Sequence, residues 1–115
     1  MKREQAQEMI ELLASEYHVV PPQLTWTNRA KNGRYFPRTR RICIGPRVWR
    51  GVVDCLLHEF AHHLYYVRKL YARTPHGRAY HVILTDVVTR WYGDVKSYQW
   101  TTEYQSIRGP AQGGK

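Results

Sequence analysis

The chain has 115 residues, of which 43% are hydrophobic, and this length and composition suit a single globular domain with one core. It carries two cysteines and no C-x-x-C pair, which argues against a disulfide framework and against a zinc ribbon. No apolar run approaches the ~20 residues that span a membrane, and the N-terminus lacks the apolar stretch of a secretory signal. We therefore expect a monomeric, intracellular and cytoplasmic protein without membrane contact, of a size that suits a phage or mobile-element gene.

The formal net charge is +9, and the positive charge is unevenly distributed, because residues 17–53 contain no acidic side chain. The positive electrostatic field of such a segment attracts polyanions, and the arginine guanidinium binds phosphate bidentately. We therefore expect nucleic acid as the first candidate partner of this segment, against the plainer alternative of a solubilising surface. The candidate nucleic-acid contacts are Arg29, Lys31, Arg34, Arg38, Arg40, Arg41, Arg47 and Arg50.

The chain opens with an amphipathic segment, residues 2–17. Its apolar residues recur at spacings of three and four, which is the period of one helix face. Two prolines, Pro21 and Pro22, follow shortly after it, and proline cannot continue the hydrogen-bond ladder of a helix. We predict a helix over residues 2–17 with an apolar face made of Ala6, Met9, Ile10, Leu13, Ala14 and Tyr17.

A β-rich segment follows. Residues 24–27 alternate apolar and polar side chains, Asn32-Gly33 is a strong turn signal, and residues 34–36 and 41–44 form two further short runs. We predict a small three-stranded antiparallel sheet, with the basic residues on its turns and outer face. Its aromatic side chains are expected to pack on the sheet, although rings among basic residues can also stack on bases. These aromatic residues are Trp26, Tyr35 and Phe36.

The most informative pattern is an H-E-x-x-H sequence, formed by His58, Glu59 and His62 within a predicted helix over residues 46–69. On a helix, residues four apart are about 5–6 Å apart at Cβ, so both histidines can give one imidazole nitrogen to the same ion. Glu59 would stand beside that ion as a general base. The pattern predicts a catalytic site with one Zn²⁺ per chain.

A helical wheel supports ligand roles for both histidines. The apolar residues gather on one side of this helix, whereas His58 and His62 lie on the opposite side, about 40° apart. A histidine that fills the core would lie within the apolar stripe instead. Asp54 and Cys55 lie on the same side of the helix as the two histidines. We expect Asp54 at the surface, although it could orient a ligand imidazole. We expect the Cys55 thiol to be packed in the interior, although it could contact the site. His63 points away from that side and is expected at the flank or surface.

A last helix is predicted to begin with Thr74 as its cap and Pro75 in its first turn. Its apolar stripe has to pack on the core and therefore face the metal helix. His76 extends this stripe at its N-terminal end, where a third ligand would have to come from. His81, at the margin of the stripe and one turn further on, is the competitor, and we favour His76. The stripe consists of Tyr80, Ile83, Leu84, Val87, Val88 and Trp91.

A helix, a small sheet, an H-E-x-x-H helix and a later His-Gly pair, in this order, resemble the SprT-like (Spartan-type) zincin metalloprotease domain. The matching segments are residues 57–62 and His76-Gly77-Arg78-Ala79-Tyr80, which lies fourteen residues after His62. The resemblance covers about residues 5–91. It implies an α+β, minimal zincin-like fold with an N-terminal helix, the sheet, the active-site helix and a further C-terminal helix, and it implies His76 as the third zinc ligand.

The resemblance also implies a zinc-dependent metalloendopeptidase that acts on DNA-associated proteins, as in the repair of DNA–protein crosslinks. This chain departs from the family at Tyr80, where phenylalanine or tryptophan is usual, and has no counterpart of the cysteine-rich ribbon found in many members. DNA contact would then depend on the basic segment. We expect the peptidase domain at residues 1–92, an aromatic extension packed on it at 93–108, and a disordered tail at 109–115.

Two other functions fit the residues. One is a basic nucleic-acid-binding module with a structural zinc and no turnover, but such a site gains nothing from a base such as Glu59. The other is a zinc peptidase unrelated to DNA, similar to ImmA/IrrE-like proteins, whose third ligand is acidic; Asp86 and Glu103 are the candidates. The residue that stabilises the oxyanion is not determined by the sequence, with Tyr65 and the tyrosines of the C-terminal extension as candidates.

Overall fold

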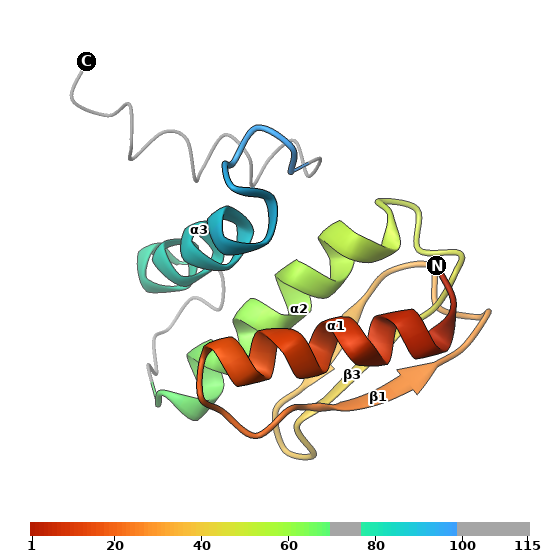
Figure 1. The fold of residues 1–115 in the computed structure, drawn as a ribbon. Helices are drawn as coiled ribbons and strands as arrows, with labels where there is room; N and C mark the ends of the chain where they lie inside the picture. The colour runs from red at the N-terminus through yellow and green to blue at the C-terminus, as the bar shows by residue number, and fades with distance from the viewer. Residues whose placement is uncertain (70–76, 99–115) are drawn as a thin grey trace.

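Figure 1 shows the fold of the computed structural model, which describes residues 1–69 and 77–98. Three helices and one three-stranded sheet make up this part of the chain, so the α+β class is confirmed. None of the helices in the described ranges has the length and apolar character needed to cross a bilayer. In chain order the elements are α1 (Arg3–Glu16), β1 (Gln23–Trp26), β2 (Arg34–Phe36), β3 (Arg41–Ile44), α2 (Val52–Val67) and α3 (Arg78–Tyr92).

The sheet is mixed, so the expected all-antiparallel arrangement is wrong. The strand order is β1-β3-β2, in which β3 pairs in parallel with β1 and antiparallel with β2. β3 takes the centre because Ile42 and Ile44 are fully buried, whereas β1 and β2 each expose side chains at the edges. Alternation of apolar and polar residues identifies a strand but says neither which strand it pairs with nor in which direction, and this is why the prediction failed.

Because β1 and β2 are not neighbours, the Asn32-Gly33 pair does not close a hairpin between them. The loop that contains it is instead tied to the segment before α2, where the Trp49 backbone N–H donates a hydrogen bond of 3.1 Å to the Lys31 carbonyl. The Trp49 indole Nε1–H also donates to the Asn32 Oδ1, at 2.5 Å. The chain bends at Asn32 without forming a hydrogen-bonded turn, and Gly33 lies against α2.

The central element is α2, which contacts α1, α3, β2 and β3. Figure 1 shows it running between α3 on one side and the strands on the other. The middle of its apolar face is fully buried, and each leucine or phenylalanine there contributes roughly 1.5–3 kcal/mol when removed from water. A helix enclosed in this way holds its polar side chains in fixed positions. The fully buried apolar residues of α2 are Leu56, Leu57, Phe60, Ala61 and Leu64.

The helix bounds agree with expectation for α1 and differ at the start of the other two. α2 begins at Val52 rather than near Pro46, because Gly51 has a φ of +89°, which a right-handed helix cannot contain. α3 begins at Arg78, after Gly77 in an extended conformation, so the expected helix start at Pro75 is wrong. Thr74 and Pro75 themselves lie outside the described residues.

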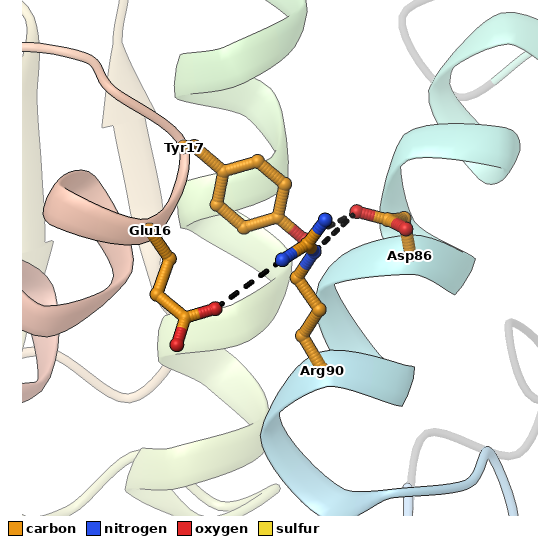
Figure 2. Close-up of polar contacts among 4 residues, drawn as sticks. All are labelled: Glu16, Tyr17, Asp86 and Arg90. Atoms are coloured by element: carbon orange, nitrogen blue, oxygen red, sulfur yellow. Dashed lines mark hydrogen bonds and ion pairs between the residues drawn. The ribbon is translucent and has the colours of Figure 1, made fainter.

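A polar network fastens α1 to α3, as Figure 2 shows. The Tyr17 hydroxyl donates a hydrogen bond of 2.6 Å to Asp86 Oδ2, and Arg90 Nε donates to the same oxygen at 3.2 Å. The Arg90 guanidinium also lies 3.4 Å from Glu16 Oε2. Burial, and next its hydrogen bond to Asp86, raise the pKa of the Tyr17 hydroxyl. This network orients α3, and with it the residues that α3 presents to α2.

Candidate metal centre

Three polar side chains of α2 come together in one group. His58, Glu59 and His62 each offer a ligand atom, and these atoms all lie within 4.8 Å of one another. The rings of the two histidines are 4.9 Å apart at their centroids and inclined at 75°. His58 and Glu59 are buried, at 6% and 4% exposure, whereas His62 is partly exposed. The group has the donor chemistry of a metal site and is reached from solvent on the His62 side.

Tyr80, in the first turn of α3, supports both histidines. Its hydroxyl donates a hydrogen bond of 2.9 Å to the backbone carbonyl of His58, and its ring stacks on that of His62 at 4.4 Å and 27°. The Tyr80 side chain is fully buried. An imidazole packed against a buried ring has few rotamers open to it, so Tyr80 reduces the entropy lost when the histidine binds an ion. The α2–α3 contact is therefore part of the site.

Glu59 is confined by the loop between β1 and β2. A methyl group on Gly33 would lie 2.1 Å from Cys55 Sγ and 3.1 Å from Glu59 Oε2, so only glycine fits at this approach. Cys55 is buried, as expected, and burial, followed by the charge of Glu59, raises the pKa of its thiol to about 12. The thiol is therefore neutral at physiological pH and acts here as packing. Gly33 and Cys55 together hold the Glu59 carboxylate in place.

Asp54 is not on the surface, so that expectation is wrong. It is 3% exposed and accepts a hydrogen bond from the hydroxyl of Tyr92, in the last turn of α3. Burial, and next this bond, raise the pKa of Tyr92, which keeps the phenol protonated as the donor. The wheel placed Asp54 beside the histidines correctly, but it could not show that α3 covers this side of α2.

His63 is also buried, at 1% exposure, so its expected place at the surface is wrong. Its Nδ1 lies 2.8 Å from the Tyr35 hydroxyl and its Nε2 lies 2.9 Å from the Val20 carbonyl. Burial lowers the pKa of His63 and raises that of Tyr35 to about 12. A neutral imidazole therefore joins α2 to β2 and to the loop before β1. The wheel showed that His63 points away from the metal side, but it could not show that β2 and the loop before β1 cover His63 there.

Tyr65 lies one turn after His62, and its ring is 6.3 Å from that of Tyr80. Its hydroxyl is buried and has no hydrogen-bond partner among the residues that the structure describes. Sequence reasoning named this residue only as one candidate for stabilising an oxyanion. Its unpaired donor near the histidines keeps it a candidate.

The remaining predicted ligands are placed as follows. His76 and Glu103 lie outside the described residues. Among the residues that the structure describes, His81 is not in the metal group; it is partly buried, and its ring is 5.5 Å from that of Tyr80. Asp86 is bound to Tyr17 and Arg90 in the network of Figure 2 and is also outside the group.

Most of the predicted basic contacts are exposed on the sheet and its loops. Arg41 differs, because it is partly buried and donates hydrogen bonds to Thr25 Oγ1 at 2.9 Å and to Gln23 on β1. Arg50 is partly buried beside the Trp49 ring. Sequence reasoning overlooked Trp49, although a tryptophan between two arginines was visible in the chain. The exposed members are Arg29, Lys31, Arg34, Arg38, Arg40 and Arg47.

Comparison of the chain with family models, curated proteins and solved structures gave no match. The function is therefore argued from the residues and from the geometry of the candidate metal centre.

Proposed function

We propose that this protein is a zinc-dependent metalloendopeptidase of the SprT-like type, with DNA-associated proteins as its substrates. The observation that carries the proposal is the convergence of His58, Glu59 and His62 within 4.8 Å on one helix that α3 and the β1–β2 loop hold rigid. Two imidazoles and an adjacent carboxylate at this spacing are the donor set of zinc peptidases.

The residues present fit zinc. Neutral imidazole is a preferred ligand of Zn²⁺, and His58 and His62 supply two such donors. We propose His76 as the third, because it directly precedes Gly77, and the first turn of α3 brings Tyr80 against both histidines. Three protein ligands leave one coordination position open, which is the arrangement of catalytic zinc.

Zinc, when bound, supplies Lewis acidity that acidifies a water and polarises a peptide carbonyl. The role of Glu59 is to accept the proton of the attacking water and then deliver it to the departing amine. Its fixed position against Gly33 and Cys55 suits that role, because a base has to stay within hydrogen-bond reach of the proton it moves. The hydroxyl of Tyr65, on the same side, has no partner within the described part of the chain, and Tyr65 is the candidate donor to the developing oxyanion.

A substrate chain can add to the outer edge of β2. This strand is at the edge of the sheet, and the residue just before it, Gly33, contacts Glu59. Backbone hydrogen bonds to an edge strand do not depend on side-chain identity, so binding of this kind tolerates many sequences. Such tolerance suits an enzyme that cleaves whichever protein is held on DNA.

The replacement Glu59→Gln tests the assigned base. The variant should retain about one zinc per chain and lose at least about 100-fold in the rate of cleavage of an unfolded protein, the scale of general-base catalysis. Glu8→Gln, on the exposed face of α1, is the matched control and should cleave as the parent does. A Glu59→Gln variant as active as the parent would refute the base. Zinc bound without any cleavage by the parent would favour the alternative of a nucleic-acid-binding module with a structural metal.

The third ligand is tested by comparing two histidine variants. His76→Ala should lower zinc content sharply, and His81→Ala should leave it unchanged, since His81 is outside the group formed by the described residues. The reverse result would move the third ligand to His81. If neither variant loses zinc, an acidic ligand such as Glu103 takes its place, as in the ImmA/IrrE-like alternative.

A further inference from the structure

An Asn-Gly pair lies next to the candidate metal centre, and its own chemistry has no part in the proposed hydrolysis. Asn32 is exposed and Gly33 is partly exposed, and the chain bends here before β2 begins at Arg34. Neither residue belongs to a helix or a strand, so no hydrogen-bond ladder holds the Gly33 nitrogen. Because glycine has no side chain, this nitrogen can approach the carboxamide of the residue before it.

A peptide nitrogen that follows asparagine can attack the asparagine side chain. The Gly33 nitrogen loses its proton and forms a bond to Asn32 Cγ, and the Nδ2 group leaves as ammonia. Water then opens the resulting five-membered succinimide ring at one of its two carbonyl carbons. Opening at Cγ gives aspartate, whereas opening at the main-chain carbon gives isoaspartate, in which the chain continues through the former side chain. Water is the only co-reactant.

Two features of the structure favour ring formation at Asn32. The Trp49 indole Nε1–H donates to Asn32 Oδ1 at 2.5 Å, and this oxygen carries the negative charge of the tetrahedral intermediate. A donor already aimed at a developing oxyanion lowers the barrier to its formation. The exposed cations of Lys31 and Arg34 lie on either side, in a segment without acidic side chains, and favour the deprotonated Gly33 nitrogen.

The surroundings of Gly33 leave no room for a longer main chain. Its N–H donates a hydrogen bond to the Cys55 thiol. A methyl group on Gly33 would already lie 2.1 Å from Cys55 Sγ and 3.1 Å from Glu59 Oε2. Isoaspartate adds one methylene to the main chain between Gly33 and Lys31, whose carbonyl is held by the Trp49 backbone N–H. The added atom therefore has to shift Gly33 relative to α2.

We propose that Asn32 is a self-modification site, whose conversion to isoaspartate moves Gly33 away from Cys55 and displaces the Glu59 carboxylate. The conversion proceeds with time rather than in response to a partner. The aspartate product keeps the normal main chain and an oxygen for the Trp49 donor, so it leaves the centre intact. The expected loss of peptidase activity rests on the proposed function, whereas the modification itself and the exposure of Cys55 do not.

The site is tested by incubating the full chain at pH 8 and at pH 6 and locating the modified residues by mass spectrometry of its peptides. Asn32 should gain about 1 Da and yield both aspartate and isoaspartate. Conversion should be faster at pH 8, because the Gly33 nitrogen reacts only after it loses its proton.

Asn28 is the internal control for this measurement. It is exposed in the same basic segment, but it precedes Arg29, whose backbone N–H donates to Thr27 Oγ1 at 3.2 Å. Loss of the side-chain amide no faster at Asn32 than at Asn28 would overturn the site. Aspartate at Asn32 without isoaspartate would mean direct hydrolysis and would overturn the ring step.

Trp49→Phe tests the role of the indole. This variant keeps an aromatic ring and lacks the N–H donor, so Asn32 should convert about 5-fold more slowly, as for the loss of one hydrogen bond. Val82→Leu, which alters an exposed side chain on α3, should leave the rate unchanged. Equal or faster conversion in Trp49→Phe would overturn the promotion by the indole.

The displacement of Gly33 is measured in Cys43→Ser, which leaves Cys55 as the single thiol of the chain. Cys55 is 1% exposed and should react with a thiol reagent only in proportion to the isoaspartate fraction, with unchanged far-ultraviolet circular dichroism. Adding Asn32→Gln, which cannot form the five-membered ring, should keep the thiol unreactive over the same incubation. An unreactive Cys55 in chains that contain isoaspartate, or a loss of helical signal, would overturn the local displacement.

Peptidase activity gives the functional readout. Activity of the parent should fall in step with isoaspartate formation, whereas Asn32→Gln should keep its activity over the same time. An equal loss in both proteins would overturn the link between Asn32 and Glu59. If the fresh parent does not cleave protein at all, the proposed function fails, and the mass and thiol measurements still decide the modification.

Discussion

Glu59 owes its position to a neighbour that has no side chain. At Gly33 the backbone approaches α2 so closely that a methyl group would overlap Cys55 Sγ, at 2.1 Å, and press on the Glu59 carboxylate at 3.1 Å. A contact this short requires the Cys55 and Glu59 side chains, the loop or the helix to move. The residue that fixes the proposed base is therefore found 26 positions before it in the chain.

Replacing Gly33 by alanine should disturb the site more than the fold. We expect Gly33→Ala to lose about 1–3 kcal/mol in the free energy of unfolding, the usual cost of overpacking, and to lose most peptidase activity because Glu59 is displaced. Urea unfolding and cleavage of an unfolded protein measure the two effects.

The double variant Gly33→Ala/Cys55→Ala is the control for this prediction. Removal of the thiol makes room for the new methyl group, so the double variant should be less destabilised than the sum of the two single variants. Strict additivity would mean that Gly33 and Cys55 do not compete for the same space.

His63 should make the stability of the protein depend on pH. Burial lowers its pKa in the folded state below the ordinary value of 6.5. The unfolded chain therefore binds the proton more readily, and the free energy of unfolding should fall as the pH drops through 6.5 toward the lowered folded-state pKa. The measurement is urea unfolding between pH 8 and pH 5 with a chelator present, so that metal binding does not contribute.

The reference for this measurement is His63→Leu, which has no group to titrate at that position. The parent should lose more stability than this variant between pH 8 and pH 5. Parallel pH profiles for the two proteins would show that His63 does not remain neutral and buried in the folded state.

At this scale the sequence predicted which three side chains of α2 come together, and it missed much of what supports them. The spacing of His58 and His62 is a local property of a helix, so it could be read directly. The apolar stripe of α3 correctly indicated that Tyr80 faces α2. The roles of Gly33 and His63 depend on which distant segments cover α2, and one sequence contains no local sign of that.

At the scale of elements, α3 is fastened to the rest of the molecule in two ways. The buried Asp54 on α2 accepts a hydrogen bond from Tyr92, and the exposed Asp86 and Arg90 take part in the network with α1 (Figure 2). The two attachments differ in solvent exposure, and hydrogen bonds to a buried charged group matter more to stability than ion pairs that water screens.

Two substitutions on α3 should therefore differ in effect. Tyr92→Phe leaves the buried Asp54 carboxylate without this donor and should reduce the free energy of unfolding by about 1–3 kcal/mol. Arg90→Met removes side-chain contacts that are half exposed and should have a smaller effect. Urea unfolding of both variants measures these two losses of free energy of unfolding. A larger loss for Arg90→Met than for Tyr92→Phe would contradict the prediction.

The order of elements along the chain could be predicted, and their arrangement in the sheet could not. Apolar spacing identified all three described helices. Alternation identified the first strand, and short runs bounded by turn residues identified the other two. β3 pairs with both edge strands and packs on α2, and its Ile42 and Ile44 side chains are fully buried. This central position is a tertiary outcome. The positive φ of Gly51 likewise depends on the loop that precedes α2.

At the scale of the whole molecule, charge is unevenly distributed among the elements. The sheet and its loops carry the basic residues of the segment 17–53, whereas α1 contains four glutamates. A molecule divided in this way should approach a polyanion with its sheet first. That orientation places the exposed arginines of the sheet and its loops toward the nucleic acid.

The central claim is that α2 holds a metal which enables Glu59 to promote peptide hydrolysis. The most direct test is cleavage of an unfolded protein by the chain after removal of metal with a chelator and dialysis, as zinc is added back stepwise. The account predicts no cleavage without metal, recovery that saturates near one zinc per chain, and no recovery in His58→Ala or Glu59→Gln. Cleavage that persists without metal, or that returns equally in Glu59→Gln, would contradict it.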